Sequence, residues 1–180
     1  MFKVTFFLKM DIEELINHLS PKGIILNIKN QLTWKNDDEE FIIEPMSVRG
    51  REAQGYRAYF TSNPESGQYL IDHFLGIFPL SISGIEYKMT SSHSQKNLIK
   101  IAEDYGLYHG SLYGLFERRK VRVGILPSSE INVQLRNKKF HLSNLANDLR
   151  EIETVAYGFK RHDFTPFSFS KYPQEELLLS

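Results

Sequence analysis

Positive charge is concentrated in one short stretch of the sequence. Residues 118–139 contain seven basic side chains and a single acidic one, Glu130. The basic side chains are Arg118, Arg119, Lys120, Arg122, Arg136, Lys138 and Lys139. Guanidinium and ammonium groups bind phosphates and carboxylates, and a cluster of them attracts anionic partners. The stretch therefore predicts a binding site for nucleic acid or for an acidic protein surface.

An alternation of apolar and polar residues indicates how this stretch folds. Apolar residues occupy every second position in 121–125 and in 131–135, and a polar segment separates the two runs. Such alternation is typical of an antiparallel hairpin with one buried face. The other face would carry cations such as Arg122, close to Tyr108 and Tyr113. Cations that bind phosphates beside aromatic rings that stack on bases are what single-stranded nucleic acid requires.

Histidines followed two residues later by serine form a second candidate site. The pattern begins at His18, His109 and His141. In an extended strand, residues two apart lie on the same face, so an imidazole and a hydroxyl can bind one phosphate group together. The simplest interpretation is that these are separate surface or helix-capping residues.

Paired H-x-[ST] units resemble the motifs of two-histidine phosphoesterases. The resemblance implies a metal-independent ribonuclease or phosphoesterase in which His109 and His141 act as general acid and base. Arg118 or Lys120 would then stabilise the negative charge that develops on the phosphate. The resemblance is limited to these short motifs, and it is the enzymatic alternative to a binding module.

Composition excludes several classes of function. Lys plus Arg and Asp plus Glu both number 22, so the formal net charge is zero and no global field attracts a polyanion. Cysteine is absent, which excludes disulfides, thiolate zinc sites, iron–sulfur clusters and cysteine nucleophiles. We expect no metal and no cofactor. No apolar run approaches the roughly 20 residues that cross a bilayer, so a cytoplasmic protein without membrane contact is expected.

Periodicity predicts the elements of the N-terminal half. Asp11 with Glu14 matches a capping box, and Pro64 matches the first position of a helix. Pro45 predicts that its strand is an edge strand or is bulged. Charged residues 35–40 predict a solvated loop. The expected order is strand 2–9, helix 11–19, strand 23–29, strand 41–48, strand 55–62, helix 63–75 and strand 79–90.

The C-terminal half has three predicted elements. Leu98, Ile101, Ala102 and Tyr105 recur at helical spacing, after a cap at Ser92 or Ser94. The basic hairpin follows, with strands over 120–126 and 131–136. A last helix is expected to start at Ser143 and to end at Gly158.

Together these elements predict an α+β fold. We expect a ferredoxin-like or related antiparallel or mixed sheet with two β-α-β successions and a C-terminal hairpin plus helix. Residues 1–162 would form one domain, and the aromatic extension 163–180 would pack on that domain or on a partner. The leading hypothesis is an intracellular, non-catalytic binding module. The alternatives are the phosphoesterase, and a protein inhibitor or assembly subunit of a larger complex.

Overall fold

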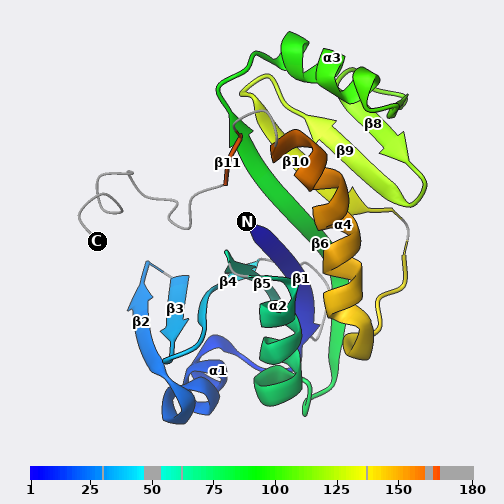
Figure 1. The fold of residues 1–180 in the computed structure, drawn as a ribbon. Helices are drawn as coiled ribbons and strands as arrows, with labels where there is room; N and C mark the ends of the chain where they lie inside the picture. Colours follow the sequence, from blue (N-terminus) through cyan, green and yellow to red (C-terminus); the bar gives the residue numbers. More distant parts are fainter. Residues whose placement is uncertain (30, 47–53, 62, 137, 161–163, 167–180) are drawn as a thin grey trace.

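Antiparallel strands form one long sheet, which the computed structural model describes over residues 1–29, 31–46, 54–61, 63–136, 138–160 and 164–166. Neighbour by neighbour across the sheet, the strands are β2 (Ile24–Ile28), β3 (Gln31–Lys35), β4 (Glu40–Met46), β5 (Gln54–Phe60), β1 (Phe2–Leu8), β6 (Leu80–Ser91), β10 (Glu130–Leu135), β9 (Val121–Ile125), β8 (Leu115–Arg118) and β7 (Tyr108–His109). A short strand, β11 (Phe164–Pro166), pairs with the end of β6 (Figure 1). The molecule is thus a mixed α+β protein.

Four α-helices accompany the sheet in the described part of the chain. They are α1 (Ile12–Leu19), α2 (Pro64–Leu70), α3 (Gln95–Asp104) and α4 (Leu145–Lys160). Figure 1 shows α2 and α4 lying across one face of the sheet. The predicted capping box of α1 is confirmed, because Asp11 and Glu14 each accept a hydrogen bond from the other's backbone N–H. Ser94 caps α3. No described helix is both long and apolar enough to span a membrane.

A line of aromatic side chains holds the helix-covered face together. Trp34, Phe41, Phe60, Phe2 and Tyr87 lie on the neighbouring strands β3, β4, β5, β1 and β6. Consecutive ring centroids along this line are 4.8–5.9 Å apart, and all five side chains are buried. Aromatic pairs at such distances add to the stabilisation that burial alone provides. The core therefore runs continuously across half of the sheet.

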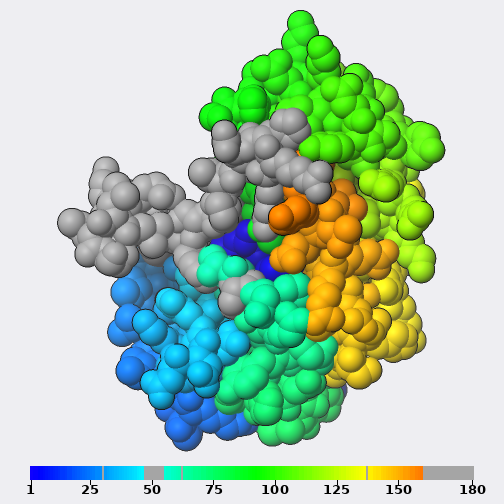
Figure 2. All heavy atoms as spheres, in the orientation of Figure 1, coloured from blue at the N-terminus to red at the C-terminus, as the bar shows by residue number. Residues whose placement is uncertain are grey.

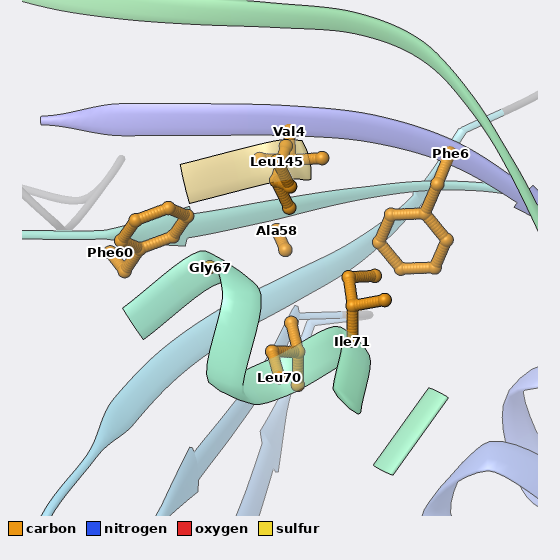
Figure 3. A pocket seen from close by; sticks show the side chains of 8 residues that line it. All are labelled: Val4, Phe6, Ala58, Phe60, Gly67, Leu70, Ile71 and Leu145. Atoms are coloured by element: carbon orange, nitrogen blue, oxygen red, sulfur yellow. The ribbon is translucent and has the colours of Figure 1, made fainter. Parts of the chain in front are cut away.

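Helix α2 approaches this face closely because it carries Gly67. A Cβ atom at Gly67 would lie 2.7 Å from the Phe60 ring and 2.9 Å from Leu149 of α4. Figure 3 shows the space around Gly67, which is lined entirely by apolar side chains. Because no polar group lines this space, it is part of the hydrophobic core and offers nothing to orient a polar ligand.

The predicted strands and helices are present, but their arrangement differs in the N-terminal part. The strand predicted over 23–29 is β2, and it does not lie beside β1 as a simple β-α-β unit requires. Residues 31–35, for which no strand was predicted, form β3, whose Trp34 is fully buried. The hairpin β2–β3 thus extends the sheet outward from β4. The polar residues that follow, 36–39, form the expected turn.

Three finer predictions have clear outcomes. The succession β5-α2-β6 exists, but β1 lies between β5 and β6 and is antiparallel to both. The pairing of β4 with β3 ends at Ile43, so at Pro45 the strand is paired only with β5. Pro45 therefore lies at an edge, where its missing N–H costs no hydrogen bond between strands. Helix α4 begins at Leu145 after a 3₁₀ turn over Leu142–Asn144, and it continues through Gly158, so both predicted ends were wrong.

The boundary predicted at 162/163 falls outside the described residues, as does most of the aromatic extension. Residues 164–166 form β11 against β6. The division into one domain and one extension stays a prediction.

Candidate anion-binding site

The basic hairpin forms as predicted. Strands β9 and β10 pair antiparallel, with Val123 directly opposite Val133. The apolar residues of both strands are buried on the helix-covered face, and Arg122, Gln134 and Arg136 lie toward the opposite face. We call that opposite side, which no described α-helix covers, the open face.

Two of the predicted cations, Arg122 and Arg136, are paired with a carboxylate of the chain itself. Arg136 Nη1 donates a hydrogen bond of 2.5 Å to Glu117 Oε2. Arg122 Nη2 lies 3.8 Å from the other oxygen of the same carboxylate. Glu117 belongs to β8 and is directly opposite Arg122 in the register. Glu117 directly precedes the basic stretch 118–139, so the charge of that stretch does not include this acid.

Opposite charges continue along the open face toward the centre of the sheet. Lys3 Nζ is 2.8 Å from Glu86 Oε2, and Arg57 Nη1 is 3.8 Å from Glu44 Oε1. Tyr59 donates a hydrogen bond of 2.6 Å to the same Glu44 oxygen. Ion pairs across neighbouring strands stabilise the sheet and leave little net charge for a ligand.

Two further groups of the open face have shifted pKa values. Burial, together with the hydrogen bond to Glu44, raises the pKa of Tyr59 well above its usual value, so its hydroxyl stays a donor. Burial and the neighbouring Lys3 ammonium lower the pKa of Lys88. Both shifts have the direction that burial of an ionisable group produces.

Lys138 is also occupied. Its ammonium group forms an ion pair with Asp148, whose carboxylate is buried in α4. A buried carboxylate needs such a partner, because removing a charge from water is costly. Lys138 therefore fastens the segment between β10 and α4 to the helix and is not available to an external anion.

Three consecutive cations remain exposed at the β8–β9 connection, and we call Arg118, Arg119 and Lys120 the basic turn. Arg118 pairs with Val121, so Arg119 and Lys120 form a two-residue turn between the strands. Arg119 has a φ of 55°, and the Arg136 N–H donates to the Lys120 carbonyl, which fixes the turn against β10. Within the described part of the chain, no carboxylate pairs with any of the three side chains. Lys139 is likewise exposed and without an ion pair there.

Of the two tyrosines predicted for this site, only Tyr108 pairs with the end of β8 that leads into the basic turn, where it shares the open face with Glu117, whereas Arg118 is opposite the buried Val121. Tyr108 is directly opposite Glu117 in the β7–β8 pairing, one residue from Arg118, and its side chain is 74% exposed. Tyr113 is also exposed, but it lies beyond the other end of β8. The four residues of β8 separate the two ends by about 10 Å. Figure 2 shows this yellow-green region on one flank of the molecule.

The paired histidines have different surroundings. His109 Nε2 is 2.8 Å from Glu103 Oε1 of α3, and its ring lies 4.8 Å from that of Phe116. His141 precedes the 3₁₀ turn that leads into α4. Among the described residues, no hydrogen bond, ion pair or ring contact joins His109 to His141. His18 Nε2 is bonded to the carbonyl of Phe74.

No metal-binding cluster occurs in the part of the chain that the structure describes. Of the residues predicted to bind an anion, the basic turn and Lys139 are exposed without an ion pair in the described part of the chain, and Tyr108 is exposed. No protein-family model matches the sequence, and a search of curated proteins finds no relative.

Proposed function

We propose that this protein is a non-catalytic module that binds single-stranded nucleic acid through the basic turn and Tyr108. The observation that carries the proposal is the contrast among the cations of strands β8 to β10. Arg122 and Arg136 on the open face are paired with Glu117, whereas Arg118, Arg119 and Lys120 at the β8–β9 connection are exposed and adjacent in sequence. Exposed cations without internal partners are the ones that can release counterions on binding a polyanion.

Tyr108 favours a single strand over an acidic protein surface. An exposed ring beside cations offers a stacking platform for an unpaired base, whose phosphates the cations can bind. Bases inside a duplex are stacked already and would not use this ring. Leu112 and Tyr113, which precede the other end of β8, are also exposed.

The test is the binding of a fluorescently labelled oligouridylate at several salt concentrations. Replacing Arg118 and Lys120 by Ala should weaken binding about tenfold at low salt, and should reduce the slope of log K against log salt by about 1.4, since two phosphate contacts are lost. Arg119 is left intact because its backbone conformation is unusual.

A matched control is available on α3. Lys96 and Lys100 are also exposed, and their joint replacement by Ala removes the same charge. This control should bind nearly as the native chain does. Equal weakening by both double variants would show that only net charge matters, and no binding by the native chain at low salt would refute the function.

Stacking is tested separately. Tyr108→Ala should weaken binding roughly 5- to 150-fold with an unchanged salt slope, because stacking is worth about 1–3 kcal/mol per base. Tyr157→Ala, at an exposed tyrosine of α4, is the control and should have no effect. An unchanged affinity of Tyr108→Ala would favour an acidic protein as the partner.

We also propose that the centre of the sheet is a ferredoxin-like unit. The order of the complete sheet differs from that of a ferredoxin-like fold, since further strands extend it on both sides. Its central strands β4, β5, β1 and β6, with α1 before β4 and α2 between β5 and β6, nevertheless follow a β-α-β-β-α-β path. In this proposal, the β2–β3 hairpin is an insertion and β7–β10 are an addition. An experimental structure with a different order of these four strands would refute it.

A further inference from the structure

Strand β2 is an apolar edge of the sheet. Within the described residues it pairs only with β3, and its far side has no neighbour. Ile24, Leu26 and Ile28 are 71%, 57% and 58% exposed. Such a row of large aliphatic side chains on an edge strand is unusual, because edges with unpaired N–H and C=O groups invite pairing with another chain.

The three aliphatic side chains lie on the open face. They occupy alternate positions of β2, and Leu26 is directly opposite Thr33. The residue between two of them, Ile25, is opposite Trp34 and packs on the core from the helix-covered face. Across the open face, Leu26 is followed by Thr33 on β3 and then by Ile42 on β4. Ile42 forms a small buried cluster with Met1 and Tyr59.

Common devices that protect an edge strand are missing from β2. Residues 24–28 include no charged residue and no proline. Lys22, just before the strand, lies with its Nζ 5.0 Å from the centre of the Phe74 ring and is directed toward its own chain. The edge can therefore accept another strand without burying a charge.

We propose that β2 pairs antiparallel with β2 of a second copy of this chain, about a two-fold axis at Leu26. The sequence of the strand is nearly symmetric about this residue, since Ile24 and Ile28 lie two positions to either side. In this register Leu26 faces Leu26 of the other copy, and Ile24 faces Ile28. Lys29 faces Gly23, so no two lysines oppose each other.

A second copy suits this edge better than an unrelated strand because the pattern is self-complementary. A two-fold axis requires the same patch on both partners, and β2 fulfils this requirement. Every described pairing in the sheet is antiparallel, so the dimer would continue the sheet in the same manner. All six aliphatic side chains would lie on one face, in cross-strand contact.

The dimer should be concentration-dependent. Two paired five-residue strands make an interface smaller than the about 1,200–2,000 Å² of stable complexes. The β2 edge and the basic turn lie toward opposite ends of the sheet, as Figures 1 and 2 show, so the dimer would leave both nucleic-acid sites accessible. The inference is thus independent of the proposed function.

Sedimentation velocity over a wide range of protein concentration tests the proposal. The native chain should shift from monomer to dimer as concentration rises, and Leu26→Lys should stay monomeric, because two ammonium groups would face each other. Ile77→Lys replaces a side chain that is 69% exposed outside β2, and it should dimerise like the native chain. A native chain that remains monomeric throughout, or a dimer that Leu26→Lys leaves intact, would overturn the proposal.

Mixing distinguishes self-pairing from other contacts. Leu26→Lys and Leu26→Glu should each be monomeric, and their mixture should form a heterodimer through the facing charges. Because the chain has no cysteine, Leu26→Cys introduces a single thiol that should form a disulfide-linked dimer on mild oxidation. Ile77→Cys is the control and should be cross-linked much more slowly. Failure of the mixture to associate would refute the register centred on Leu26.

Discussion

The two faces of the sheet hold their side chains by different means. On the helix-covered face, a line of buried aromatic rings runs from Trp34 to Tyr87. On the open face, charged side chains pair across neighbouring strands, as Lys3 does with Glu86 and Arg136 with Glu117. The first face excludes water, and the second neutralises its own charge.

This difference shows why a basic sequence does not by itself make a basic surface. A strand places alternate residues on the open face, where the register decides which charge each one meets. At the β8–β9 connection, Arg119 and Lys120 have no opposite neighbour and Arg118 is opposite the apolar Val121, so all three cations stay exposed. Both surfaces that we propose for partners therefore lie at the ends and edges of the sheet.

The largest expected effect comes from removing the ring that anchors the aromatic line. Trp34 is fully buried, contacts Phe41 and Phe74, and donates a hydrogen bond of 3.2 Å to the carbonyl of Leu19. Trp34→Ala should lower the free energy of unfolding by about 3–5 kcal/mol. Urea unfolding measures the loss.

The neighbouring residue of the same strand is the control for the other face. Thr33→Ala changes a half-buried side chain directed to the open face, and it should cost less than about 1 kcal/mol. If both variants lost the same stability, the two faces would contribute equally, contrary to the comparison.

Much of this arrangement could be predicted from the sequence, and the missing parts have physical reasons. The helices at 12–19 and 95–104 carry local signals, a capping box and an i, i+3, i+4, i+7 stripe, which depend on adjacent residues only. The position of β2 depends on contacts distant in sequence, which local periodicity does not report. β3 could have been predicted, because residues 31–35 alternate polar and apolar side chains as residues 121–125 do, with Leu32 and Trp34 buried.

The candidate site could be predicted only in part, because the partners of its cations depend on contacts between different elements. The seven cations are evident from composition, but three of them are neutralised by Glu117 and Asp148. Asp148 is ten positions from Lys138, and only the docking of α4 brings the two together. Glu117 could have been recognised, because a two-residue turn at 119–120 places it opposite Arg122.

Alkaline pH should lower the stability of the fold through Tyr56, whose hydroxyl is buried on the helix-covered face next to α1. Burial, and then the negative charges of Asp11 and Glu14, raise the pKa of Tyr56 to about 12, and its hydroxyl donates to the Met10 carbonyl. Between pH 10 and 12 the unfolded chain releases this proton while the folded chain retains it. Stability therefore falls as pH rises through this window.

The measurement is thermal unfolding at several pH values. Tyr56→Phe should be less stable at neutral pH because the hydrogen bond is lost, and it should show a shallower decline above pH 10. A variant with the same alkaline decline as the native chain would assign that decline to other groups.

A variant without the Glu117 carboxylate tests whether the paired arginines of the open face can behave like the unpaired cations of the basic turn. Glu117→Gln removes the carboxylate shared by Arg122 and Arg136, and should cost about 1 kcal/mol of stability. It should also tighten oligouridylate binding and steepen its salt dependence by up to about 1.4, because two cations become available beside the basic turn. Glu86→Gln, at the carboxylate paired with Lys3, changes net charge equally but lies farther from that turn. Equal tightening by both variants would contradict a local effect.

The smallest expected effect separates backbone strain from charge in the basic turn. Arg119 and Ser129 have φ values of 55° and 64°, in the left-handed region that glycine adopts most easily. A non-glycine residue there costs about 1–2 kcal/mol. The greater chain entropy that glycine loses on folding offsets about 0.5–1 kcal/mol of this. Arg119→Gly and Ser129→Gly should therefore each stabilise the fold by about 0.5–1 kcal/mol, whereas only Arg119→Gly should weaken oligouridylate binding. A loss of stability in Arg119→Gly would show that its side chain contributes contacts to the fold, and the basic turn would then resemble the open face instead of differing from it.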